Sequence, residues 1–119
     1  MAFLDILKQI VDNFEGCIGG ILIGIDGIVV EQYIKDDQII DFQNIGVEYM
    51  ELLKTISETS HTLGFDEPEQ IIVEYADTVL IIRSINKDYF VLLAAKKDGN
   101  IGKGKFLLRK NLLNLSKEF

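Results

Sequence analysis

The chain of 119 residues contains only one cysteine, one histidine and one proline, and these scarcities exclude several kinds of site. A single thiol, Cys17, can form neither an internal disulfide nor a cysteine-based zinc cluster, and its apolar neighbours predict a buried structural thiol. One histidine, His61, is too few for a histidine metal cluster, and we expect it to be a partly exposed helix residue. We therefore predict no metal or cofactor site, and a reducing cytoplasm as the location.

Long hydrophobic runs and a basic charge balance are also absent. No segment approaches the ~18 uninterrupted apolar residues of a membrane span, and the N-terminal segment carries Asp5, Asp12 and Glu15 within its apolar pattern. We expect neither a signal peptide nor a membrane anchor. The net charge of −7 argues against general binding of nucleic acid through a basic surface.

The charge is distributed unevenly along the chain. Residues 96–119 hold seven basic and two acidic side chains, a local balance of +5, so residues 1–95 carry −12. Such asymmetry bears on partners and association rather than on the fold. Within this segment Lys103, Lys110 and Lys117 recur every seven residues, flanked by Phe106 and Leu113. They form either a solubilising helix face or a basic strip for an acidic partner.

Hydrophobic periodicity predicts eight elements in a single domain spanning residues 1–119. Helical spacing covers 2–15, 41–64 and the segment after Asn100, with Asp41 or Asn44 as a cap and Gly64 as an end. Strand-like runs flank Asp26-Gly27, which favours a type I′ hairpin turn, and three more occupy 71–75, 78–85 and 89–95. In the long helix the expected core stripe is Ile45, Tyr49, Leu52, Leu53, Ile56 and Leu63.

The element order is helix, two strands, helix, three strands, helix. Runs of strands instead of strict alternation predict an α+β fold with a mainly antiparallel five-stranded sheet. The first and last strands are the most apolar and are expected at the centre, so the second and third become the edges. An edge strand with the sequence IIVEY lacks an internal lysine or proline and invites pairing with another copy. We therefore predict a homodimer.

One glycine-rich stretch, DGNIGKGKFLLRK at residues 98–110, has two readings. A Walker phosphate loop needs Gly-x4-Gly-Lys-Ser/Thr, but Lys97 stands at the first glycine position and Gly104 at the hydroxyl position. The better reading is a helix start capped by Asn100. Together with the hairpin GGILIGIDGIVVEQY and the element order, this stretch resembles the roadblock/dynein light chain family, especially its bacterial MglB-type members.

This resemblance implies a specific assembly and role. It implies a sheet with the middle helix on one face and the terminal helices on the other, and homodimers that join third strands and pair middle helices. It also implies binding of a small Ras-like GTPase, often as its activator. The expected dimer residues are Gln70, Ile71, Ile72, Val73, Glu74 and Tyr75, with Met50, Ser57 and His61 from the small-residue flank of the middle helix, which core packing explains equally well.

The GTPase-binding candidates are the middle-helix residues that point away from the apolar stripe: Glu48, Glu51, Lys54, Thr55 and Glu58. Only Arg83 and Arg109 could act as arginine fingers, and both fall within regular elements rather than mobile loops. We therefore expect a regulator that orders the catalytic residues of its partner and has no catalytic centre of its own. The alternative is a structural light chain or scaffold that links larger proteins; a small-ligand sensor is a third possibility.

Overall fold

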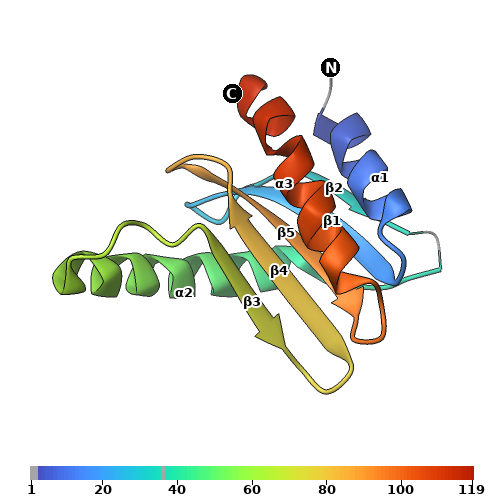
Figure 1. Ribbon diagram of the computed structural model, residues 1–119, viewed down its shortest axis with the longest axis horizontal. Helices are drawn as coiled ribbons and strands as arrows, with labels where there is room; N and C mark the ends of the chain where they lie inside the picture. Colours follow the sequence, from blue (N-terminus) through green and yellow to red (C-terminus); the bar gives the residue numbers. More distant parts are fainter. Residues whose placement is uncertain (1–2, 36) are drawn as a thin grey trace.

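The computed structural model describes residues 3–35 and 37–119 and shows the element order expected from the sequence (Figure 1). Ala2, the first residue of the predicted N-terminal helix, lies outside the described residues. The elements are α1 (Phe3–Asn13), β1 (Cys17–Gly24), β2 (Val29–Ile34), α2 (Phe42–Leu63), β3 (Gln70–Glu74), β4 (Thr78–Ser84), β5 (Tyr89–Lys96) and α3 (Ile101–Lys117).

All five strands form one antiparallel sheet in the order β2-β1-β5-β4-β3. The predicted centre and edges are confirmed. Strands β1 and β5 are buried along nearly their whole length, whereas β2 alternates between half-buried and exposed positions and β3 is half-buried. Strands buried on both faces need apolar residues at every position, which is why the centre could be recognised from composition.

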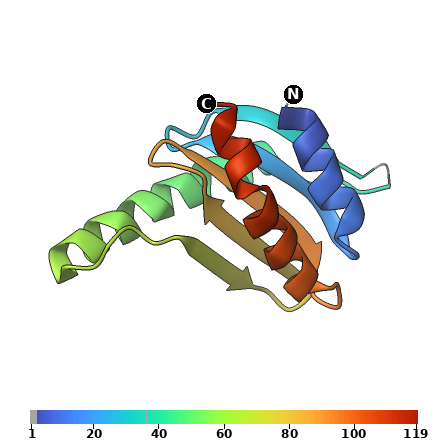
Figure 2. The same ribbon diagram turned by 45° about the horizontal axis from the view of Figure 1, so that its top comes forward.

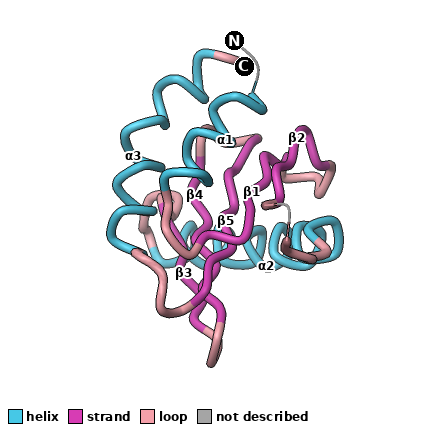
Figure 3. The backbone as a smooth tube through the Cα atoms, turned by 90° about the vertical axis from the view of Figure 1, so that its right-hand side faces the viewer, coloured by secondary structure: helices cyan, strands magenta, loops and turns pink. Residues whose placement is uncertain are grey.

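Helices cover both faces of the sheet. Helices α1 and α3 lie side by side on one face, and α2 crosses the other, as the three views agree (Figures 1, 2 and 3). One hydrophobic cluster joins α1 and α3 to alternate residues of the strands, including Leu22, Ile81 and Leu93. A second joins α2 to the intervening residues, including Ile21 and Leu92. The three-layer arrangement implied by the family resemblance is confirmed.

Side-chain caps fix the starts of the two longest helices. The Asp41 carboxylate accepts a hydrogen bond from the backbone N–H of Asn44 at 3.2 Å, and Gly64, with φ of 79°, ends α2 in the left-handed conformation. The Asn100 side chain likewise accepts from the N–H of Lys103 at 3.1 Å. The glycine-rich stretch is therefore a helix start, as predicted.

The β1–β2 turn differs from the predicted type I′ form. Type I′ requires positive φ at both central residues, but no described residue other than glycine has positive φ, so Asp26 does not fit. Instead the N–H of Gly27 donates to the carbonyl of Gly24, and Gly27 alone enters the left-handed region with φ of 86°. The Asp26 carboxylate accepts from the N–H of Ile28 at 3.0 Å and stabilises the wider loop.

Within the described part of the chain, no helix combines the length and apolar character that crossing a bilayer requires.

Cys17 is a buried structural thiol, as predicted. Its Sγ lies 3.4 Å from the Ala94 carbonyl oxygen, and burial raises the pKa of the thiol to about 12. Only on the order of one thiol in ten thousand is then ionised at pH 8, and the thiolate is the reactive form. We expect native alkylation by iodoacetamide at pH 8 to be at least ~1000-fold slower than in urea, measured by mass spectrometry. Equal rates in the two conditions would contradict this burial.

Candidate functional site

The second half of α2 extends beyond the edge of the sheet (Figure 1). Its buried residues, Phe42, Gly46, Met50 and Leu53, all lie within the first twelve of its 22 residues. From residue 54 to residue 63 every position is half-buried or exposed. A helical segment of this length gains little stability in water without packing against something else. The projecting half of α2 is therefore a surface that a partner can cover.

The core-facing side of α2 differs from the predicted one. Leu52 and Leu63 were expected in the core, but they are 47% and 63% exposed. Leu53 is buried as predicted, and Ile45 and Tyr49 are half-buried against the same cluster. The buried set, however, follows the spacing Phe42, Gly46, Met50, Leu53, so the centre of the core stripe is rotated by somewhat less than the ~100° of one residue. Helical periodicity alone did not distinguish two overlapping stripes. The close approach of Gly46 to Ile23 decides between them, because a Cβ at Gly46 would lie 2.3 Å from the Ile23 side chain.

This rotation leaves an apolar flank of α2 on the side of the sheet where β3 lies. The hydroxyls of Tyr49 on α2 and Tyr75, just after β3, are hydrogen-bonded to each other. Burial, followed by this hydrogen bond, raises the pKa of Tyr49 to about 12. The half-buried or exposed apolar residues of this open side, which we call the β3-side surface, are Ile45, Tyr49, Leu52, Ile56, Leu63 and Tyr75. The sequence analysis assigned five of them, all on α2, to the core stripe.

Strand β3 forms the other part of this open side. It pairs with β4 on one side only, through Gln70 opposite Arg83 to Glu74 opposite Val79. Its three apolar residues, Ile71, Ile72 and Val73, are half-buried. Such an edge, with backbone groups open on one side and apolar side chains on both faces, is suited to adding another strand.

The remaining predicted dimer residues lie elsewhere on α2. Met50 is only 1% exposed and packs in the core, which was the alternative to a dimer contact for this flank of α2. Ser57 is half-buried and His61 is exposed. On a helical wheel they lie about 80° and 120° round from Tyr49, and Ser57 contacts Glu67 in the loop before β3. The structure thus brings β3 together with Tyr49, and not with Ser57 or His61.

The five GTPase-binding candidates are all exposed on α2. Lys54 and Glu58, with Ser57, line a cavity of about 280 Å³ whose other walls include Lys87 and Phe90 near the β4–β5 turn. The Ser57 hydroxyl donates to the Glu67 carboxylate, which fastens the α2–β3 loop against this cavity. Charged groups around an apolar floor give a surface that can recognise a protein partner.

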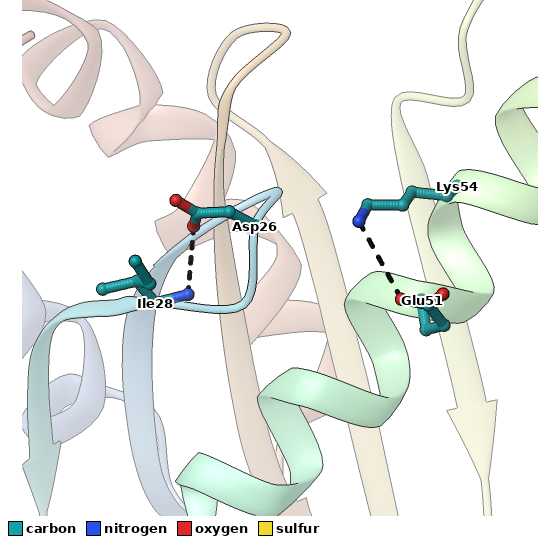
Figure 4. A network of polar contacts seen from close by, with 4 residues as sticks. All are labelled: Asp26, Ile28, Glu51 and Lys54. Atoms are coloured by element: carbon teal, nitrogen blue, oxygen red, sulfur yellow. Dashed lines mark hydrogen bonds and ion pairs between the residues drawn. The ribbon is translucent and has the colours of Figure 1, made fainter.

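Two of the candidates form an ion pair on the outer side of α2. The Lys54 Nζ lies 3.9 Å from the Glu51 carboxylate (Figure 4), and Lys54 lines the same cavity as Ile25, which follows β1. Their side chains are 48% and 77% exposed, so the pair contributes little to stability and both charges are accessible. Glu48 and Thr55 lie further round the helix, towards its β3 side.

Neither arginine lies on the α2 face. Arg83 is two residues after Ile81 on β4, and residues two apart on a strand point to the same face. Because Ile81 packs with α1 and α3, the Arg83 side chain also lies on the face opposite α2. Its Nη1 donates to the Gln70 side-chain oxygen at 3.4 Å. Arg109 is exposed on α3. In residues 3–35 and 37–119, no three histidine, cysteine, aspartate or glutamate side chains gather as a metal-binding group.

Comparison with known proteins places this architecture. No family model matches the sequence. No curated protein matches it either. Among solved structures, MglC from Myxococcus xanthus is 31% identical, with all of both chains covered and a TM-score of 0.72. MglB from Myxococcus xanthus has a TM-score of 0.87 at 13% identity, over 97% of this chain and 85% of that chain.

A third structure supplies the name of the fold. The Roadblock/LC7 domain from Streptomyces avermitilis has a TM-score of 0.73 at 15% identity, over 92% of this chain and 94% of that chain. The fold therefore defines a roadblock-type sheet covered by helices on both faces. With the full-length likeness to MglC, the chain belongs to the Roadblock/LC7 family.

Proposed function

We propose that this chain is a homodimeric regulator of a small Ras-like GTPase and has no catalytic centre of its own. The observation that carries the proposal is the combination of an unpaired β3 edge with the apolar flank of α2 beside it. Pairing two copies through β3 would bring their α2 helices together, because Tyr49 and Tyr75 tie the helix to that edge. The two α2 helices would then present one composite face that a monomer lacks.

The composite face would hold the partner GTPase through the exposed charges of α2. Because Arg83 and Arg109 lie away from this face, we propose that stimulation works by ordering the catalytic residues of the GTPase rather than by inserting an arginine. A second candidate function is a docking scaffold without stimulation. The observation that favours this second candidate is the identity to MglC, 31%, which exceeds the 13% identity to MglB.

Charge reversal on α2 tests the proposed binding face. The small Ras-like GTPase encoded nearest in the genome would be loaded with GDP or a non-hydrolysable GTP analogue, and its affinity measured by calorimetry. We expect Glu51→Lys to weaken binding by about tenfold, because a rim charge affects association more than folding. Asp5→Lys, an exposed change on α1 across the sheet, is the matched control and should leave the affinity unchanged.

The hydrolysis assay separates the two mechanisms. Arg83→Ala and Arg109→Ala should lower stimulated hydrolysis far less than the ~1000-fold expected for losing an arginine finger. If either variant abolished stimulation while binding and fold stayed intact, an arginine acting in trans would replace the ordering mechanism. Binding without any stimulation would instead support the scaffold, and absence of binding to either nucleotide form would remove the GTPase proposal.

A further inference from the structure

Helix α3 presents an apolar ridge on the side that faces away from the core. Its buried residues, Gly104, Leu107, Leu108, Asn111 and Leu115, point to the sheet and α1. On a helical wheel Phe106 and Leu113 lie opposite them, and they are 50% and 65% exposed. Residues seven apart on a helix are about 10 Å apart along one side. Within the described part of the chain, these two large apolar side chains are therefore at least half exposed to water.

Basic side chains surround this ridge. Lys103, Lys110 and Lys117 follow one side of it at seven-residue intervals, and Lys105 and Arg109 follow the other; all five are exposed. Helix α3 contains no acidic residue. Within the described residues none of these five cations lies within 4.0 Å of a carboxylate, since the ion pairs there join Lys54 to Glu51 and Lys97 to Glu74. The charge of α3 is thus uncompensated, in a protein whose net charge is −7.

We propose that this face of α3 binds an acidic amphipathic helix of another protein. The apolar ridge would pack against the apolar stripe of that helix, and the cations on both sides would pair with its carboxylates. The seven-residue recurrence of the lysines and of the two apolar residues matches the heptad spacing by which helices pair side by side. Aromatic residues at the core with polar groups at the rim are a usual composition of protein interfaces.

A narrow partner fits this surface better than a flat anionic membrane. Helix α1 lies beside α3 on the same side of the sheet (Figure 2). It exposes Asp5 and Asp12, and Glu15 is exposed just after its end. A flat anionic surface laid across both helices would meet these carboxylates, whereas a helix lying along α3 would contact its outer side alone. Two apolar side chains are also few for membrane insertion, which scales with buried apolar area.

Pairing of α3 with the α3 of a second copy is disfavoured by like charge, because five cations would face five cations. The surface also lies across the sheet from the proposed GTPase-binding face, as Figure 3 shows. The two sites are therefore independent. This inference does not rest on the proposed function, and its failure would leave that function standing.

The test uses the full chain and a labelled designed helix of about 21 residues, three heptads, with leucines along one side and glutamates beside them. Binding is followed by fluorescence anisotropy at low and high salt. We expect micromolar affinity that weakens as salt rises, and no measurable binding of the same peptide with lysine in place of glutamate. Lack of binding of the acidic peptide, or equal binding of the two peptides, would overturn the proposal.

Surface variants locate the contact. Two variants of α3 should each weaken acidic-peptide binding at least about tenfold. One is the triple variant Lys103→Glu, Lys110→Glu and Lys117→Glu, and the other is the double variant Phe106→Ala and Leu113→Ala. The controls lie outside α3: Lys87→Glu in the β4–β5 turn and Ile28→Ala in the β1–β2 turn. Both residues are exposed, and these variants should bind like the unmodified chain. Circular dichroism confirms that each variant is folded. The proposal fails if the controls weaken binding as much as the α3 variants.

Two further outcomes would assign the surface to another occupant. The first outcome is that the unmodified chain sediments with vesicles of phosphatidylserine and phosphatidylcholine, the triple-glutamate variant does not, and the peptide does not bind. That outcome would mean a membrane site. A lower oligomeric state of the triple-glutamate variant in analytical ultracentrifugation, without peptide binding, would mean that a second copy covers α3. Either result overturns the acidic-helix proposal.

Discussion

Ile72→Lys should convert a dimer into a monomer in analytical ultracentrifugation at micromolar concentration. Ile72 lies at the middle of β3, the edge strand that pairs only with β4. A lysine there places a charge in the contact between two edges, which blocks strand addition. We expect the dissociation constant of the dimer to rise by about a hundredfold, close to 2.8 kcal/mol.

Two further variants separate loss of the interface from loss of the fold. Val30→Lys places the same charge on β2, the opposite edge, at a residue that is 40% exposed, and should leave the dimer intact. Tyr75→Lys changes an exposed residue of the β3-side surface, next to β3, and should also weaken the dimer. An unmodified chain that sediments as a monomer at micromolar concentration, or a fully dimeric Ile72→Lys variant, would contradict the interface.

Gly104→Ala should lower the free energy of unfolding by about 1–3 kcal/mol, and Gly104→Leu by more. A Cβ on Gly104 would lie 2.2 Å from the Cε2 atom of Phe14, a residue with no solvent exposure. The ring is enclosed between α1, α3 and the sheet, so it cannot move aside without opening the core. Urea unfolding at a fixed protein concentration measures the change.

Gly102→Ala is the control on the same helix, two residues earlier. Beyond the backbone of the helix itself, the nearest atom to an added Cβ would be the Asn100 side-chain oxygen at 3.9 Å, so an added methyl group fits. We expect a change within about 0.5 kcal/mol, or a slight gain from better helix propensity. Adding Phe14→Leu to Gly104→Ala should cost less than the sum of the two single changes, because the residues are in contact. Equal costs for the two glycine changes would contradict the close packing of α3 on Phe14.

The sequence determined most of the fold because its strongest signals are local or bounded by caps. Asp41, Gly64 and Asn100 mark helix ends by side-chain and backbone chemistry that any neighbouring structure would preserve. The apolar character of β1 and β5 similarly required a central position. These features depend little on distant contacts, so they could be predicted from the residues alone.

The candidate site was less predictable because it depends on rotation and proximity. Leu52 and Gly46 belong to overlapping helical stripes, and only the packing of Gly46 on Ile23 shows which stripe faces the sheet. The approach of Tyr49 to Tyr75 joins residues 26 positions apart, which no local pattern indicates. The prediction of a type I′ turn at Asp26 was wrong for a related reason. The length of that loop depends on the pairing register of β1 and β2, which shifts between Leu22 and Ile23.

The projecting half of α2 makes association and ordering parts of one equilibrium. Residues 54–63 gain little from the core of their own chain, so in a lone copy these turns depend on the first half of the helix to remain helical. Contact with a second copy or another protein would hold them in place, and the entropy lost in doing so subtracts from the affinity. The complex would form specifically and still release quickly, which suits a component that must bind and let go repeatedly.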